Sequence, residues 1–79
     1  MNQLKAFDKT IEVWEEFYTE DQGLDPSLTL AHAIDMQRRI TPDFSEAKLG
    51  RWLGWIQAAA VANGIGTLET YKTINMESQ

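Results

Sequence analysis

Apolar residues recur at alternating steps of three and four along the first quarter of the chain. The residues that share this spacing are Leu4, Phe7, Ile11, Trp14 and Tyr18. An α-helix over residues 2–20 would place all of them along one face. The acidic residues Glu12, Glu15 and Glu16 would lie on the remaining surface. The pattern therefore predicts an amphipathic helix with an acidic outer side.

A second helix is predicted over residues 26–40, between two prolines. Asp25 is a favourable N-cap, and Pro26 suits the first helical position because a backbone N–H there would have no partner. Pro42 disfavours helical geometry in the residue before it, so the helix is expected to end there.

Two more helices are predicted over residues 45–63 and 67–75. Ser45 and Thr67 are suitable N-caps, and Gly64 is a typical C-terminal stop. No segment shows the sustained alternation of a β-strand. The sequence therefore predicts an all-α fold, a compact bundle of four helices that forms a single domain.

The third predicted helix carries a row of small residues at every fourth position. The members of this row are Gly50, Gly54, Ala58 and Ala62. A glycine inside a helix costs roughly 1 kcal/mol relative to alanine. A row of small side chains lets another helix approach closely, which makes it a helix-packing groove. Two interpretations stay open: the aromatic face of the first helix packs into the groove, or a partner chain does.

Two tryptophans and an arginine lie beside this row. Trp and Arg are over-represented among the residues that dominate binding energy at protein interfaces. Arg51, Trp52 and Trp55 are therefore candidate partner-binding residues. A self-complementary groove would make the protein a homodimer.

The charge of −5 is distributed unevenly over the 79 residues. The first 37 residues carry a net charge of −6, and residues 38–79 carry +1. Direct nucleic-acid binding is not expected, because it requires neutralisation of phosphate charge. Glu12, Glu15 and Glu16 offer a second candidate surface, which would attract a basic partner. In one version of this hypothesis, these carboxylates mimic nucleic-acid phosphates and occupy the basic nucleic-acid site of a host protein.

No constellation of residues predicts catalysis, and neither a metal site nor a cofactor is expected. The chain has no cysteine, and His32 is its single histidine. Asp35 and His32 could together bind a metal ion or relay a proton, but no second histidine or cysteine completes such a site. The "GIG" at residues 64–66 follows a predicted helix, whereas a dinucleotide-binding loop follows a strand. The chain is therefore expected not to be an enzyme.

No membrane segment or signal peptide is predicted. The longest run rich in apolar residues, 49–65, is interrupted by Arg51, Gln57 and Asn63, and it is shorter than the roughly 20 residues that span a bilayer. A soluble, cytoplasmic protein is expected.

The alternative is a dimeric helix-turn-helix regulator that uses the second and third predicted helices. Lys48, Arg51 and Gln57 would then read DNA bases, and Arg38 and Arg39 would contact phosphates. The glycines and tryptophans of the reading helix suit packing better than base recognition.

The segment "FSEAKLGRWLGWIQAAAVANGIGTLETYKTIN", residues 44–75, resembles small helical proteins encoded by bacteriophages. The resemblance implies an accessory protein of the host-cell cytoplasm, which inhibits or modulates a host or defence protein by stoichiometric binding. It transfers no functional residue, because that group shares no common site. The leading prediction is a small acidic, non-enzymatic protein-binding module.

Overall fold

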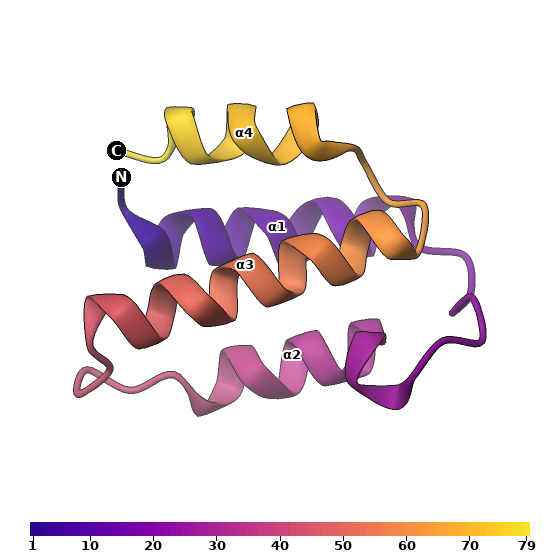
Figure 1. The fold of residues 1–79 in the computed structure, drawn as a ribbon, viewed down its shortest axis with the longest axis horizontal. Helices are drawn as coiled ribbons and strands as arrows, with labels where there is room; N and C mark the ends of the chain where they lie inside the picture. Colours follow the sequence, from indigo (N-terminus) through magenta and orange to yellow (C-terminus); the bar gives the residue numbers. More distant parts are fainter.

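The computed structural model describes residues 1–79 as four α-helices and one short 3₁₀ turn. The elements are α1 (Gln3–Phe17), η1 (Pro26–Leu28), α2 (Leu30–Arg39), α3 (Glu46–Ala62) and α4 (Leu68–Glu77). Consecutive α-helices run in opposite directions, and both chain ends lie at the same end of the bundle (Figure 1). The predicted all-α bundle of four helices is confirmed.

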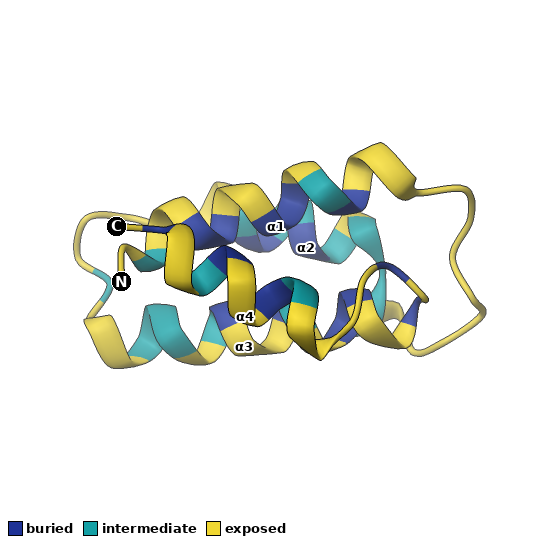
Figure 2. Cartoon of the chain, turned by 90° about the horizontal axis from the view of Figure 1, so that it is seen from above, coloured by how far each residue is buried: buried dark blue, intermediate teal, exposed yellow.

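α1 is the central helix of the bundle, because it packs against each of the other three α-helices. Phe7, Ile11 and Trp14 are buried, as the apolar spacing predicts. Tyr18 is exposed because α1 ends at Phe17, after which the backbone is extended and leaves the helical face. Leu4 is also exposed, at an open rim between α1 and α4. The exposed positions of α1 lie along its outer side (Figure 2).

The four helices share one hydrophobic core. Its buried members are Ala6, Phe7, Ile11, Trp14, Ala33, Met36, Leu53, Ile56, Ala59, Ala60, Ile65, Tyr71 and Ile74. None of the helices combines the length and the apolar character needed to cross a membrane.

The second predicted helix is divided in two, which corrects its expected start. Asp25 caps only the 3₁₀ turn η1, through a hydrogen bond from the Ser27 amide to its carboxylate. Thr29 then adopts an extended conformation and caps α2, because its hydroxyl oxygen accepts from the His32 amide. The same hydroxyl donates to the carbonyl of Pro26, which ties the turn to the helix.

The predicted ends of α3 are confirmed. The Ser45 hydroxyl caps its first turn by accepting from the Lys48 amide. Asn63 follows its last residue, and Gly64 then takes a φ of +77°, the left-handed conformation that glycine adopts most readily.

α4 begins as predicted, at a capping box formed by Thr67 and Thr70. It runs two residues past the predicted end at position 75. Locally, the Ser78 hydroxyl donates to the Ile74 carbonyl four residues back. In addition, a tertiary bond forms, because the Ser78 carbonyl accepts from the Asn2 amide. The start of α1 therefore holds the end of α4.

Polar side chains also connect the helices inside the bundle. Gln57 of α3 donates to the Thr10 hydroxyl of α1 and exchanges amide hydrogen bonds with Asn75 of α4. The Tyr71 hydroxyl donates to the Ile65 carbonyl over 2.7 Å, and burial raises the pKa of Tyr71 to about 12.

Candidate functional site

One side of α3 lies in the core and the sides next to α2 and α4 are open. Between α2 and α3 lies a cavity of about 570 Å³, which we call the aromatic cavity. Its lining residues are Ser27, His32, Asp35, Met36, Arg39, Arg51, Trp52 and Trp55. The structure thus brings together all three candidate partner-binding residues of α3.

Both tryptophans of the aromatic cavity are held in place by neighbouring groups. Trp55 is 47% exposed, yet its indole Nε1 donates to the Ser27 carbonyl over 2.9 Å. Trp52 is half-buried, and the ring of Phe44 meets it edge to face at a centroid distance of 4.9 Å. Rigid aromatic side chains lose little conformational entropy when a ligand binds them.

Basic side chains outnumber acidic ones at the aromatic cavity. The Lys48 ammonium lies over the Phe44 ring, 4.2 Å from its centroid, and 5.5 Å from that of Trp52. Arg39 is paired with Asp35 at 2.8 Å, whereas Arg51 forms no salt bridge. Residues 38–51 contain four basic and two acidic side chains, so this segment carries a net positive charge.

The contacts of Phe44 and Lys48 with Trp52 were not predicted from the sequence. A usable signal was present, because Lys48 and Trp52 are four residues apart and therefore neighbours on a helix surface. Phe44 precedes the helix, so its contact with Trp52 depends on the path of the loop before α3.

The row of small residues lies at the surface. Gly54, Ala58 and Ala62 are exposed, and a Cβ atom added to Gly54 would meet no other atom within 4 Å. A Cβ at Gly50 would lie 3.2 Å from the side-chain oxygen of Gln3. The interpretation that the aromatic face of α1 packs into this row is therefore wrong.

α3 turns larger side chains toward the core instead. Leu53, Ile56 and Ala60 are buried there, and burying more apolar area is more favourable. Gly54 and Ala58 line a shallow cavity of about 430 Å³ between α3 and α4. The exposed side chains of Val61 and Leu68 lie at the same cavity.

The three carboxylates proposed as a second surface do not share one environment. Glu12 forms a salt bridge with Lys9 at 3.2 Å and lines a cavity between α1 and α4. Glu15 and Glu16 are exposed, form no salt bridge and lie in the last turn of α1, where no basic residue is present. Carboxylates at a helix C-terminus are unfavourable next to the negative end of the helix dipole.

His32 and Asp35 both line the aromatic cavity, but they form no hydrogen bond with one another. The Asp35 carboxylate accepts from Arg39 Nε instead. No group of three or more His, Asp or Glu side chains is placed to hold a metal ion.

Gly54 and Gly64 provide a matched test of these environments, because a Cβ at either would meet no atom within 4 Å. Gly54→Ala should raise the free energy of unfolding by about 1 kcal/mol, since alanine is the better helix former. Gly64→Ala should lower it by about 1–2 kcal/mol, since Gly64 has a positive φ. Urea unfolding followed by circular dichroism measures both. A loss of stability in Gly54→Ala would contradict the exposed position of the row.

Comparisons of this chain with protein-family models, with curated proteins and with solved structures gave no match.

Proposed function

We propose that this chain is a small, acidic, non-enzymatic module that binds another protein through the aromatic cavity. The observation that carries the proposal is the fixed, exposed indole of Trp55 beside an arginine that has no ionic partner. Binding energy at interfaces concentrates in such Trp and Arg side chains, especially around a pocket that an apolar group can fill.

The chemistry of the aromatic cavity favours a partner segment with an apolar side chain flanked by carboxylates. Trp52, Trp55 and Met36 offer apolar contact, while Arg51 and Lys48 attract negative charge. In this proposal the protein acts in the cytoplasm and inhibits or modulates its target by stoichiometric binding. A host or defence protein is the target implied by the resemblance to bacteriophage accessory proteins.

Mimicry of nucleic acid by α1 has weaker support. Glu12 is already paired with Lys9, and Asp8 accepts a hydrogen bond from Gln37. These contacts leave Glu15 and Glu16 as the unpaired carboxylates of the helix.

The arrangement of α2 and α3 does not favour the helix-turn-helix alternative. The two helices of that motif meet at a steep angle, about 90–120°. Here α2 and α3 lie side by side and run antiparallel along the bundle (Figures 1 and 2). Lys48, one of the proposed base-reading residues, lies over the Phe44 ring.

Affinity capture from a host lysate tests the proposal, with native mass measurement of what is retained. We expect the natural sequence to retain one protein in a fixed molar ratio. The double variant Glu15→Gln, Glu16→Gln is the control and should retain the same protein. Trp55→Ala should not retain it. Loss with the glutamate variant alone would move the contact to the acidic helix. Retention of DNA fragments with a steep salt dependence would favour the regulator instead.

A further inference from the structure

The end of α1 carries an exposed aromatic side chain in a stretch of sequence rich in acidic residues. Phe17 is the last residue of α1 and is 62% exposed. Its acidic neighbours in sequence are Glu15, Glu16, Glu20 and Asp21. No lysine or arginine occurs between Lys9 and Arg38. We call Phe17 and these four acidic residues the acidic knob.

The acidic knob and the aromatic cavity are complementary in both apolar character and charge. The cavity volume of about 570 Å³ is large enough to admit a phenyl ring, and tryptophan and methionine line it. Arg51 and Lys48, near that cavity, form no salt bridge, and neither do the carboxylates of the knob. Charges of opposite sign without a salt bridge therefore accompany the two apolar elements, acidic near Phe17 in sequence and basic near the cavity.

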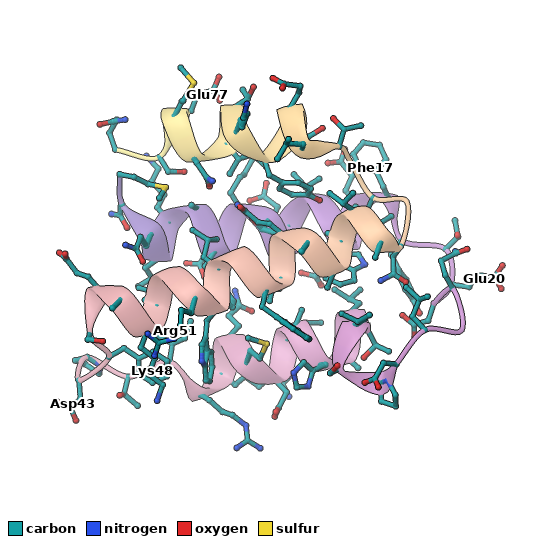
Figure 3. The ribbon with its side chains drawn as sticks, in the orientation of Figure 1. Phe17, Glu20, Asp43, Lys48, Arg51 and Glu77 are labelled. Carbon is teal, nitrogen blue, oxygen red and sulfur yellow. The ribbon has the colours of Figure 1, made fainter.

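The acidic knob of one molecule cannot contact the charged rim of the aromatic cavity in the same molecule. Phe17 and Glu20 lie toward one end of the longest axis, and Lys48 and Arg51 lie toward the other (Figure 3). That axis extends over 32 Å. Contact between the knob and the charged rim of the cavity therefore requires two molecules.

We propose that a second copy of this chain occupies the aromatic cavity by inserting Phe17, with its acidic neighbours facing Arg51 and Lys48. This inference rests on the proposed function, because it takes the cavity as a protein-binding site and names an occupant. The contact joins two different surfaces, so each pair keeps one free knob and one free cavity and can add further copies. Self-association then competes with any other protein for the cavity.

A complementation experiment tests this geometry. Phe17→Ser removes the knob, and Arg51→Glu reverses the charge beside the cavity; both residues are exposed, so both variants should fold. Met76→Ser is the matched control, because Met76 is 76% exposed on α4 and belongs to neither surface. Circular dichroism verifies folding, and sedimentation equilibrium measures the masses.

For the natural sequence and the Met76→Ser control, we expect the average mass to rise above 9.0 kDa with concentration. This rise should shrink at about 1 M salt, where the Debye length is about 3 Å. Each surface variant alone should associate at least about tenfold more weakly than the natural sequence, since one hot-spot group is lost or reversed. Their mixture should form dimers and nothing larger, because only one intact knob and one intact cavity remain.

Three results would overturn the inference. The natural sequence could stay monomeric up to about 1 mM, which corresponds to a binding free energy weaker than about 4 kcal/mol. The Phe17→Ser variant could assemble as well as the natural sequence, which would indicate a different interface. The mixture of variants could fail to form dimers. If any of these occurs while Trp55→Ala still abolishes capture of another protein, the proposed function stands and only self-association is rejected.

Discussion

Replacing Trp14 with alanine should lower the free energy of unfolding by about 3–5 kcal/mol. Trp14 is 0% exposed and is the largest fully buried side chain of the protein. It lies on α1, which packs against α2, α3 and α4, so the cavity left behind would open between several helices. A domain of this size has a total stability on the order of 4–12 kcal/mol. The variant should therefore be largely or wholly unfolded at moderate temperature, as urea unfolding monitored by circular dichroism will measure.

Phe17→Ala is the matched control for Trp14→Ala. Phe17 is an aromatic residue on the same helix, but it is mostly exposed. We expect its replacement to change stability by no more than about 0.5 kcal/mol. Similar losses in the two variants would contradict the burial of α1.

The indole Nε1 of Trp14 adds a second comparison. It is buried and has no hydrogen-bond partner within the chain. Trp14→Phe removes this unpaired donor and keeps most of the apolar volume, so it should cost less than half as much as Trp14→Ala.

Replacing Asn63 with alanine should lower the free energy of unfolding by about 2–3 kcal/mol. Asn63 is buried, and its amide nitrogen donates to the carbonyls of Leu28 and Ala59 over 2.6 and 2.8 Å. Its side-chain oxygen accepts from the Gln22 amide. Alanine would remove all three bonds and leave the Leu28 carbonyl and the Gln22 amide without this partner, and the same urea titration will measure the loss.

The Asn63 variant should also disturb the aromatic cavity. Asn63 holds Leu28 at the end of η1, and Ser27 of the same turn accepts the hydrogen bond from Trp55. Loosening η1 should therefore free the Trp55 ring, which tryptophan fluorescence quenching under folding conditions will detect. Amide hydrogen exchange at Gln22 should accelerate as well.

Asn75→Ala serves as the control for Asn63→Ala. Asn75 is only half-buried and bonds to Gln57, which has an additional partner in Thr10. The expected loss is about 1 kcal/mol, with no change in fluorescence quenching. A larger loss for Asn75 than for Asn63 would show that the connection between α3 and α4 is the more important one.

Local side-chain chemistry explains why the helix boundaries were predictable. Ser45, Thr67 and Gly64 act through groups within a few residues of each helix end, and all three have the predicted role. The division before α2 was missed because Asp25 and Thr29 are both competent caps and lie four residues apart. The sequence shows that a cap is present, but the choice between two caps depends on the fold around them.

The sequence identified some candidate site residues correctly, but it did not indicate their surroundings, which depend on the fold. The sequence identified Arg51, Trp52 and Trp55 by residue type, and the fold gathered them at one cavity with α2 residues. The row of small residues was found by its spacing, but spacing does not say which side of a helix faces the core. Asn63 and Gln57 were not recognised as connecting residues, because their partners are distant in sequence.

The sequence by itself determined that this protein is helical, where α1, α3 and α4 begin, where α2 and α3 end, and which face of α1 is buried at its centre. These properties follow from hydrophobic periodicity and from capping groups, both of which act over a few residues. The tertiary structure alone decided the rotation of α3, the exposure of Gly54 and Ala58, and the position of Trp55 beside Arg51. Those outcomes depend on how much apolar area each packing buries and on hydrogen bonds between distant segments, such as Trp55 to Ser27.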